Sequence, residues 1–414
     1  MRVMVLNSGS SSVKMQILDM LQGEGARTTP ATPPLIRGIL KGIGGKAALE
    51  LEIEGQPNTK TSQLVKDHHE AIRWLFENLE RISGQEVNPG LLSTVEAIGH
   101  RVVHGGDRFS DSLVIDDKVV NEIEALSELA PLHNPPCLEG IRFARNVFGA
   151  NIPMVAVFDT AFHHSLPAKA RAYALPHALA ARHGIRRYGF HGIAHASLAA
   201  GYAAFTGKSL EGTRLITLQL GNGCSVAAIA NGRSIETSMG FTPLEGLVMG
   251  TRSGDLDPAV VSFLSQKESV DASEVERWLN EDSGLLGISG RTNDMRELLK
   301  ATAQEHDERA RLAIELFCYR IQKYIGAYLS VLGGAEAIVF GGGIGEASPD
   351  IRAGICEGME WCGLRLDIDR NRRCVGLLPG AASQISEEGA TLKAYVVAAD
   401  EETWIARETV RCLV

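Results

Sequence analysis

Residues 2–18 read RVMVLNSGSSSVKMQIL. Two apolar runs flank a turn made of Asn, Gly and Ser residues. Apolar runs that are broken by Gly and Ser are typical of a strand, a turn and a second strand. We therefore predict strands over 2–6 and 13–18, joined by a polar turn over 7–12.

The same arrangement recurs in the second half of the chain, where residues 215–229 read LITLQLGNGCSVAAI. The turn here is Gly221-Asn222-Gly223, and Asn231-Gly232 is typical of a hairpin turn after the second strand. A repeated opening suggests a duplicated architecture. The matching part is short, Ser11-Ser12-Val13 against Cys224-Ser225-Val226, so by itself it leaves duplication and coincidence equally open.

Strands and helices alternate along the rest of the chain. Further buried strands are predicted over 95–103, 153–158, 337–340 and 393–398. Helices are predicted where apolar residues recur with the helical period, over 62–82, 117–129, 307–332 and 401–411. Residues 22–48 are rich in Gly, Pro and Thr and are predicted to be an irregular surface excursion. This alternation favours an α/β fold class.

The composition is that of a globular protein. Its 414 residues suggest two domains or one large bilobed domain. The formal net charge of −9 argues against a nucleic-acid partner, so an anionic ligand would be held by a few placed cations. The seven cysteines form no CxxC pair, which favours reduced thiols and a cytoplasmic location. Neither a signal peptide nor a run of roughly 18 apolar residues is present, so we expect no membrane partner.

Three glycine-rich turns follow apolar strands. Asn7 to Lys14 combines backbone N–H groups, hydroxyls and one lysine, which suits phosphate oxygens, although an ordinary solvated hairpin has the same composition. Gly221 to Gly223 and Gly341 to Glu346 would let the backbone approach a nucleotide closely. The pattern GxxxxGK[ST] is absent, which excludes a P-loop. Together the turns favour a nucleotide site.

Two arginines stand in unusual surroundings. Arg101 lies within GHRVVHGG at 99–106, at the end of an apolar strand, where an unpaired guanidinium would cost several kcal/mol. An internal carboxylate and an anionic ligand explain it equally well. Arg252 lies within GTRSGDLD at 250–257, and the nearby acids favour an internal ion pair.

Other polar residues are more ambiguous. Asp159 ends an apolar strand, where α/β sheets place their ligands, so a functional role is favoured. His191 stands between an aromatic and a glycine, a setting that is more often structural than catalytic. The pairs His68-His69 and His163-His164 have no common face to clamp a metal, and both are interpreted as structural or surface residues.

Taken together, these segments closely resemble the acetate kinase family. The resemblance runs in family order along nearly the whole chain and includes 5–14, 99–106, 131–136, 158–163, 188–192, 220–223, 250–258, 287–296, 343–346 and 401–402. It implies a two-lobed, duplicated ribonuclease H-like fold, shared with sugar kinases, the Hsp70 ATPase domain and actin, with ATP in the interdomain cleft. The expected lobes are 1–160 with about 396–414, and 161–395. The family also implies a homodimer.

The resemblance assigns roles to individual residues. Arg101, Asp159, His191 and Arg252 would form the reaction centre, and Asn7 and Glu401 would hold Mg²⁺ directly or through water. The ATP-binding residues implied are Ser10, Ser12, Lys14, Gln219, Leu220, Gly221, Asn222, Gly223, Asp294, Met295, Arg296, Gly342, Gly343, Ile344, Gly345 and Glu346. The substrate-binding residues implied, besides Arg101, are Val103, Leu132, His133, Phe190 and Pro243, of which Val103, Leu132, Phe190 and Pro243 match the pocket for the methyl group.

Physical reasoning agrees with the implied reaction, phosphoryl transfer between ATP and acetate. Phosphoryl transfer needs positioning and charge stabilisation more than covalent chemistry, and two arginines, a histidine and Mg²⁺ would offset the repulsion between two anions. A carboxylic acid with a pKa near about 4–5 is already ionised at pH 7, so no general base is needed. We therefore expect Asp159 to orient Arg101 or the magnesium shell.

Three alternatives stay open. A propionate kinase would share every charged residue and differ by a pocket preference of only about 1–3 kcal/mol. A sugar kinase would need an aspartate base and polar groups for the ring. A catalytically silent ATP-binding module would not require Arg101, His191 and Arg252 together.

Overall fold

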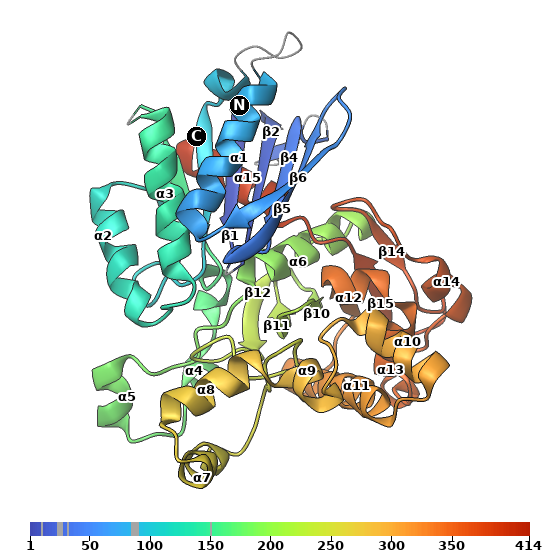
Figure 1. Ribbon diagram of the computed structural model, residues 1–414. Coiled ribbons are helices and arrows are strands. Elements are labelled where there is room, and N and C mark those ends of the chain that lie inside the picture. The colour runs from blue at the N-terminus through green and yellow to red at the C-terminus, as the bar shows by residue number, and fades with distance from the viewer. Residues whose placement is uncertain (10, 23–27, 31–32, 84–90, 150) are drawn as a thin grey trace. The chain divides into compact units, whose positions relative to one another are not determined.

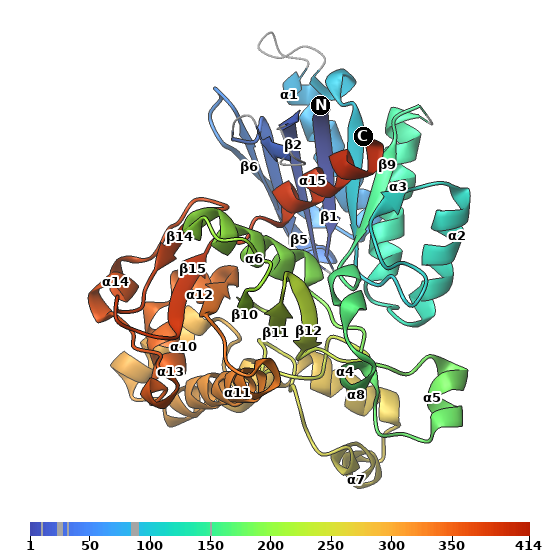
Figure 2. The ribbon, with the colours of Figure 1, turned by 180° about the vertical axis from the view of Figure 1, so that it is seen from behind.

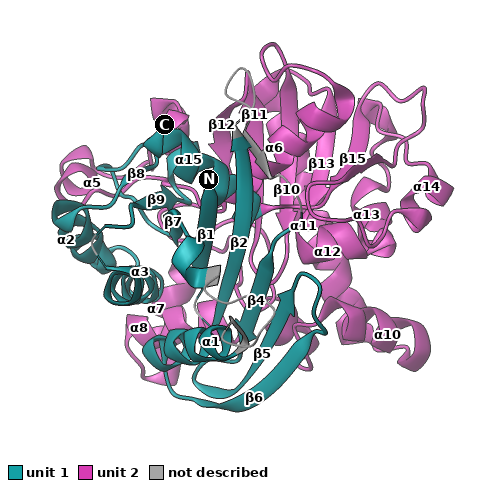
Figure 3. Cartoon of the chain, turned by 90° about the horizontal axis from the view of Figure 1, so that it is seen from above, with its two compact units in different colours: residues 1–162, 401–414 teal, residues 163–400 magenta. Residues whose placement is uncertain are grey.

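The computed structural model describes residues 1–414 except 10, 23–27, 31–32, 84–90 and 150. The chain forms two compact units (Figure 3). Unit 1 comprises Met1–Phe162 and Glu401–Val414, and unit 2 comprises His163–Asp400. Both termini therefore belong to unit 1.

Unit 1 is built on one sheet with the strand order β6-β5-β4-β2-β1-β7-β9-β8, and β3 pairs with β2. Its strands are β1 (Arg2–Ser8), β2 (Ser12–Gln22), β3 (Thr28–Pro30), β4 (Ile36–Lys41), β5 (Gly45–Ile53), β6 (Thr59–Val65), β7 (Ala97–Val102), β8 (Leu113–Val114) and β9 (Met154–Phe158). The central strands β1, β7 and β9 are almost entirely buried, as expected for parallel strands with helices on both faces.

Helices cover both faces of this sheet. They are α1 (His68–Ser83), α2 (Asp117–Ala125), α3 (Asn134–Phe148) and α15 (Glu401–Leu413), and a 3₁₀ turn (Leu126–Glu128) extends α2. Helices α1 and α3 pack together on one face, and the C-terminal helix α15 packs on the other (Figures 1 and 2). Gly99 of β7 permits that close packing, because a Cβ there would lie 2.3 Å from Oγ1 of Thr409.

Unit 2 has a sheet with the order β12-β11-β10-β13-β15-β14. Its strands are β10 (Arg214–Leu220), β11 (Cys224–Ala230), β12 (Arg233–Thr237), β13 (Ala337–Gly341), β14 (Ala382–Gln384) and β15 (Lys393–Val397). Helix α6 covers one face and α11 the other (Figures 1 and 2). The helices are α4 (Ala168–Arg171), α5 (His177–His183), α6 (Gly192–Thr206), α7 (Ala259–Glu268), α8 (Ala272–Glu281), α9 (Gly284–Ser289), α10 (Met295–Glu305), α11 (Glu308–Leu332), α12 (Gly342–Ala347), α13 (Pro349–Cys356) and α14 (Ile368–Arg373).

The two sheets repeat one topology. In unit 1, β1 pairs antiparallel with β2, β2 antiparallel with β4, and β1-β7-β9 run parallel. In unit 2, β10, β11 and β12 are paired in the same antiparallel way, and β10-β13-β15 run parallel. Even the last parallel strand of each sheet carries a short antiparallel neighbour, β8 or β14. The predicted α/β class and the duplication are therefore confirmed.

Most predicted elements are also confirmed. The strands over 95–103, 153–158, 337–340 and 393–398 correspond to β7, β9, β13 and β15. The helices over 117–129, 307–332 and 401–411 correspond to α2 with its 3₁₀ turn, α11 and α15. The predicted hairpin turn has φ 52° at Asn231 and φ 72° at Gly232, both in the left-handed region that such turns require.

The prediction of an irregular excursion over 22–48 is wrong for its described part, which contains β3, β4 and the start of β5. Within β4, Ile36 and Leu40 are buried and alternate with less buried neighbours, the pattern of a half-buried strand. Gly38 lies between them because a Cβ there would come within 3.1 Å of the Leu51 side chain. This glycine thus reflects close packing rather than a turn.

Three boundaries also differ. The helix predicted over 62–82 begins only at His68, because Thr59–Val65 form the polar edge strand β6. The turn predicted over 7–12 is shorter, since Asn7 pairs with Lys14 and the strands extend into it. The glycine-rich segment after β13 begins helix α12 instead of forming an open turn.

Among the described residues, no helix has the length and apolar character needed to cross a membrane. All seven cysteines are free thiols in the structure.

Candidate functional site

A charged cluster in unit 1 centres on Arg101. Its Nη2 and Nε donate to Oδ2 of Asp159 at 2.5 and 3.1 Å, and its Nη1 donates to Oδ1 of Asn7 at 3.1 Å. The side chains of Arg101 and Asp159 are only 16% and 3% exposed. Burial alone would lower the pKa of Arg101, but attraction to Asp159 and Glu401 outweighs it and raises that pKa. Of the two interpretations left open for Arg101, the internal carboxylate is present.

The sheet explains why these residues meet. Strands β7 and β9 run parallel, with Arg101 opposite Val157, so Asp159 follows immediately at the end of the neighbouring strand. The Asp159 N–H continues the ladder by donating to the carbonyl of Val102 at 3.0 Å. Asn7 lies near the same end of β1, which neighbours β7. The polar residues thus gather at the carboxyl ends of parallel strands, where α/β sheets bind ligands.

The start of α15 adds two carboxylates. Nδ2 of Asn7 donates to Oε2 of Glu401 at 3.2 Å and to Oε1 of Glu402 at 3.1 Å. Nζ of Lys14 lies 3.5 Å from Oε1 of Glu402, and these two carboxylates raise the pKa of Lys14. Asn7, from the first strand, therefore joins Arg101 to the acids of the last helix.

The donor set fits Mg²⁺ with a small number of protein ligands. Glu401 and Asn7 offer hard carboxylate and amide oxygens, which Mg²⁺ prefers, and Mg²⁺ usually keeps several of its waters. Oδ1 of Asn7 already accepts a hydrogen bond from Arg101, so the carboxylate of Glu401 is the better direct ligand. Among the described residues, no group of three or more His, Cys, Asp and Glu side chains could form a complete cage.

The first turn is closed by backbone contacts. The N–H of Gly9 donates to the carbonyl of Ser12 at 2.8 Å, and Nε2 of His68 lies 2.7 Å from the carbonyl of Gly9. His68 therefore supports the turn, which agrees with its structural interpretation. Ser12 begins β2, whereas Ser10 lies outside the described residues.

In unit 2, His191 has an unusual backbone. Its φ and ψ are 57° and 24°, a left-handed conformation that is rare for a residue other than glycine, and it precedes the first residue of α6. Backbone strain of this kind often marks a functional site. Nδ1 of His191 lies 2.8 Å from Oγ of Ser225 on β11. The buried His163 holds the preceding residue, because its Nε2 donates to the carbonyl of Phe190 at 3.0 Å.

Gly223 brings the turn after β10 against two charged or polar side chains. A Cβ on Gly223 would lie 3.3 Å from Nε2 and Cε1 of His191, and 3.5 Å from Nη1 of Arg252. His191, Arg252 and this turn therefore form one cluster. Only a residue without a side chain leaves that space open.

The prediction of an internal ion pair for Arg252 is wrong. Its Nη1 donates to the carbonyl of Pro243 at 3.2 Å and approaches the sulfur of Met249 at 3.9 Å, and among the described residues it forms no ion pair. Asp255 instead accepts from Tyr324 at 2.8 Å and from the N–H of Gly246 at 2.9 Å. Burial lowers the pKa of Arg252, as expected for a guanidinium without a carboxylate.

The other predicted ATP-binding residues belong to three segments of unit 2. Gln219 and Leu220 end β10, and the carbonyl of Asn222 accepts from the N–H of Gly250 at 2.8 Å. Asp294 caps α10 and pairs with the exposed Arg296 at 2.5 Å, while Met295 between them is buried.

The third segment is the start of α12. The N–H of Gly342 and that of Ala399 both donate to Oε1 of Glu346, at 2.8 and 3.0 Å. Gly342 has φ 75°, and a Cβ there would lie 2.6 Å from the carbonyl of Leu220. Gly343, Ile344 and Gly345 form the first turns of α12 beside the end of β10.

Sequence reasoning missed Arg352, which secures this segment. It is fully buried, and its guanidinium donates to the carbonyls of Gly345 and Glu346 at 2.8 and 2.9 Å and to Oδ1 of Asn371 at 2.8 Å. All its acceptors are neutral, and burial lowers its pKa. Its place in the amphipathic segment after Pro349 offers no signal in the sequence that it is buried.

The predicted pocket residues differ in exposure. Val103 and Phe190 are buried, whereas Leu132 is 61% exposed. His133 precedes the first residue of α3, and Pro243 lies in the loop after β12.

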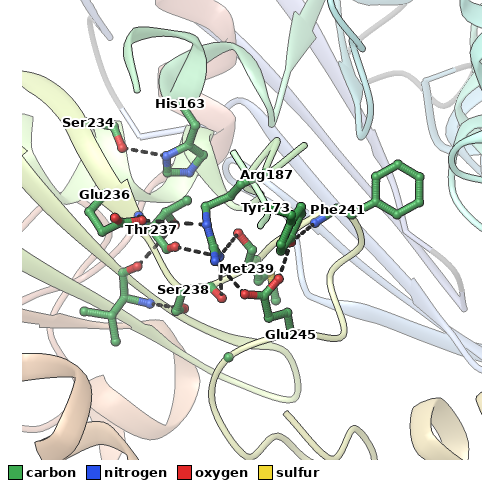
Figure 4. Close-up of polar contacts among 12 residues, drawn as sticks. His163, Tyr173, Arg187, Ser234, Glu236, Thr237, Ser238, Met239, Phe241 and Glu245 are labelled. Carbon is green, nitrogen blue, oxygen red and sulfur yellow. Dashed lines mark hydrogen bonds and ion pairs between the residues drawn. The ribbon is translucent and has the colours of Figure 1, made fainter. Parts of the chain in front are cut away.

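A partly buried polar cluster, also missed from the sequence, holds that loop in place (Figure 4). Nη1 of Arg187 donates to the carbonyls of Thr237, Ser238 and Met239 at 3.1–3.3 Å, and its Nη2 donates to Oε1 of Glu245 at 2.5 Å. The hydroxyl of Tyr173 donates to the other oxygen of Glu245 and accepts from the N–H of Phe241. The loop that carries Pro243 is thus held at both ends.

Comparison with known proteins gives concordant results. The sequence matches the Acetokinase family over residues 2–407. It is 50% identical over its whole length to the acetate kinase of Solibacter usitatus, of which it covers 98%. Among solved structures, it resembles the acetate kinase of Porphyromonas gingivalis, with 37% identity, a TM-score of 0.88 and full coverage of both chains. It also resembles a propionate kinase of Francisella tularensis, with 36% identity, a TM-score of 0.87 and 99% coverage of both chains.

Proposed function

The chain belongs to the acetokinase family, and we propose that it catalyses the reversible transfer of the γ-phosphoryl group of ATP to acetate, giving ADP and acetyl phosphate. The observation that carries this proposal is Arg252, a guanidinium next to His191 and the Gly223 turn whose protein partners are all neutral. Such a cation suits an anion that arrives with the substrate, and phosphoryl transfer depends on charges of this kind.

In unit 1, Arg101 holds the substrate carboxylate. Its pairing with Asp159 and Asn7 fixes the plane of the guanidinium, which suits the fork geometry that carboxylates prefer. Lys14 and Ser12 bind phosphate oxygens, and we retain Ser10 in that role as well. We propose that the two units are the two catalytic domains.

In unit 2, Arg252 and His191 donate to the transferring phosphoryl group, which passes in line to the carboxylate oxygen. The nucleotide is bound by residues 219–223, by residues 294–296 and by residues 342–346. Three features support these roles: the Gly223 turn lies beside His191, Asp294 caps the start of α10, and a Cβ on Gly343 of α12 would meet no atom within 4 Å.

Asp159 orients Arg101 and is not a base. The substrate is already a carboxylate at neutral pH, so no proton has to be removed. Both contacts of Asp159 with Arg101 go to the same oxygen at 2.5 and 3.1 Å, which supports a positioning role.

Glu401, assisted by Asn7, holds Mg²⁺. When bound, Mg²⁺ supplies positive charge that offsets the charge of the phosphate oxygens. The protein's own part is to keep Glu401 in place, which the amide of Asn7 does at 3.2 Å.

The pocket for the methyl group comprises Val103, Leu132, Phe190 and Pro243, with His133 beside it. Propionate is the alternative substrate, because one methylene changes the preference by only about 1–3 kcal/mol and a propionate kinase is among the similar structures. The ratio of kcat/KM values for acetate, propionate and butyrate decides between them.

The test of the reaction is formation of acyl phosphate from ATP, Mg²⁺ and acetate, trapped as the hydroxamate. Product with acetate supports the proposal, and product only with longer acids would favour the propionate alternative. No product with any short acid would contradict a carboxylate kinase and favour a silent ATP-binding module.

We further propose a homodimer located in the cytoplasm. The dimer is what the resemblance of the sequence to the family implies, and the free state of the seven cysteines agrees with a reducing compartment. Sedimentation equilibrium tests the dimer, since the monomer has a mass of 44.5 kDa.

A further inference from the structure

A chain of buried hydroxyl and imidazole groups ends at His191. Nδ1 of His191 lies 2.8 Å from Oγ of Ser225, and the same Oγ lies 2.8 Å from Nε2 of His195. Nδ1 of His195 lies 2.8 Å from Oγ1 of Thr217. Ser225, His195 and Thr217 are completely buried, so the polar groups have to satisfy one another.

The secondary structure places these groups in one line. Ser225 and Thr217 lie on the neighbouring strands β11 and β10, where Ser225 pairs with Gln219 two positions from Thr217. His191 directly precedes α6 and His195 lies in its first turn, and a ring nitrogen of each lies 2.8 Å from Oγ of Ser225. The imidazoles therefore face the two hydroxyls across one helix–sheet contact.

The buried end of the chain determines the direction of every hydrogen bond. Within the described part of the protein, Nδ1 of His195 is the only hydrogen-bond partner of the Thr217 hydroxyl. If Nδ1 of His195 carried a proton, Thr217 would accept it and its own hydroxyl hydrogen would be buried without an acceptor. The hydroxyl of Thr217 therefore donates to His195, and Nδ1 of His195 carries no proton.

The remaining directions follow by counting protons. His195 is neutral, because burial and its histidine neighbours lower its pKa well below the ordinary value. Its single proton is then on Nε2, which donates to Oγ of Ser225. Among the described residues, Nδ1 of His191 is then the one acceptor left for the hydroxyl hydrogen of the buried Ser225, so this hydroxyl donates to His191. If all these hydrogen bonds ran in the opposite direction, one buried hydroxyl would be unsatisfied. This cost favours the described direction over the opposite one by roughly 5- to 150-fold.

We propose that Thr217, His195 and Ser225 are positioning residues that hold His191 in the tautomer with its proton on Nε2, so that it donates from the nitrogen beside Gly223. This inference rests on the proposed function, in which His191 donates to the transferring phosphoryl group. Nε2 is the atom of His191 nearest to the space that a side chain at residue 223 would occupy, together with Cε1. A donor fixed in this way needs no rearrangement at the moment of transfer.

Nitrogen-15 NMR of histidine-labelled protein tests the tautomer without any substrate. Signals are assigned with His191→Gln and His195→Gln. We expect, at neutral pH, a protonated Nε2 and an unprotonated Nδ1 in both rings. A proton on Nδ1 of His191 would overturn the inference.

Variants test whether the hydrogen-bonded residues from Thr217 to His191 act together. Thr217→Val should reduce the Nε2–H population of His191 and lower kcat by roughly 5- to 10-fold, the effect of one lost hydrogen bond, while KM for ATP changes less than about twofold. Thr217→Ser keeps the hydroxyl and should restore both readouts. Ser225→Ala should act like Thr217→Val, and Ser225→Cys, with a weaker donor, should lie between it and the wild type.

A matched control separates this effect from a loss of packing. Thr213, just before β10, is also buried, but its hydroxyl donates to the carbonyl of Ser209 at 2.6 Å, away from the chain. Thr213→Val should alter neither the tautomer nor kcat. If Thr217→Val changes kcat only as much as Thr213→Val does, the positioning role is refuted.

The two proposals can fail separately. If no acyl phosphate is formed with any acid, the proposed function fails, and the NMR result still decides whether the chain orients His191. If acyl phosphate is formed and Nδ1 of His191 is protonated, the further inference alone fails.

Discussion

Replacing Asp159 with asparagine removes one charge from the cluster around Arg101 and leaves the shape nearly unchanged. In the wild type, one carboxylate oxygen accepts from Nη2 and Nε of Arg101, and both side chains are largely buried. Removing one partner of a buried ion pair costs about 3–5 kcal/mol. Asn7 and the nearby charge of Glu401 still attract Arg101. We therefore expect the free energy of unfolding to fall by an amount near the lower limit, about 3 kcal/mol.

The effect on activity follows from the same geometry. Without the fixed carboxylate, Arg101 no longer has a single orientation for the substrate. We expect kcat/KM for acetate to fall by about 10²–10³-fold, the size of effect found when a donor that stabilises charge is removed. If Asp159 orients Arg101 and removes no proton, as proposed, the loss should be the same at every pH between about 6 and 9, where the carboxylic acid substrate is ionised.

The assay is initial-rate formation of acetyl hydroxamate as a function of pH, together with urea unfolding of both proteins. Asp19→Asn is the matched control, since Asp19 accepts from Nε and Nη2 of Arg2 at 2.8 and 2.9 Å, also in unit 1. It should lower stability and leave kcat/KM unchanged. Recovery of Asp159→Asn activity at high pH, or loss of one ionisation from its profile, would show that Asp159 acts as a base and refute the reasoning.

Three further predictions follow from the site. Gly223→Ala places a methyl group 3.3 Å from the ring of His191, so kcat should fall at least tenfold while circular dichroism and melting temperature change little; an unchanged kcat would contradict the close approach. Glu245→Gln leaves the partly buried Arg187 without its closest carboxylate and should raise KM for acetate and alter the acetate-to-propionate ratio of kcat/KM, with KM for ATP as the internal control. Burial lowers the pKa of His163 from 6.5 to about 4, so the unfolded chain binds more protons between these values. The contribution of His163 to stability should therefore be complete above pH 6.5 and be lost at up to about 1.4 kcal/mol per pH unit below it, and the buried His100 and His195, whose pKa values are also lowered, should add to this loss; flat urea midpoints from pH 6.5 to 5 would contradict this.

Local patterns were sufficient for most of the framework. The apolar runs around Asn7 and around Gly221 predicted both β-hairpins, because strand and turn residues differ sharply there. Strand β4 was missed, since Gly38 and the neighbouring prolines resemble a loop although the glycine is required by side-chain packing across the sheet. Strand propensity depends on the residue types in a segment and contains no information about the side chains that pack against them.

In the candidate site, too, some residues could be recognised from the sequence and others only from the structure. Arg101 and Asp159 were recognisable in the sequence, because a charge at the end of an apolar strand needs an explanation. Arg352 was not recognisable, since its acceptors are backbone carbonyls, and every residue has a carbonyl. The ion pair predicted for Arg252 was wrong because nearness in sequence did not bring Asp255 to it.

The α/β class, two glycine-containing turns after buried strands, and the unusual places of Arg101 and Asp159 at the ends of apolar strands follow from the sequence alone. These depend on local composition and on the cost of placing a charge beside apolar residues. Which charges neutralise each other is defined only in the folded chain, where Arg101 pairs with Asp159 and the hydrogen-bond partners of Arg252 are neutral. The fold likewise brings Thr217, His195 and Ser225 into hydrogen-bond distance of one another and of His191. Electrostatic and hydrogen-bond partners come from distant segments, and their effect depends on distance and burial, which only the folded chain defines.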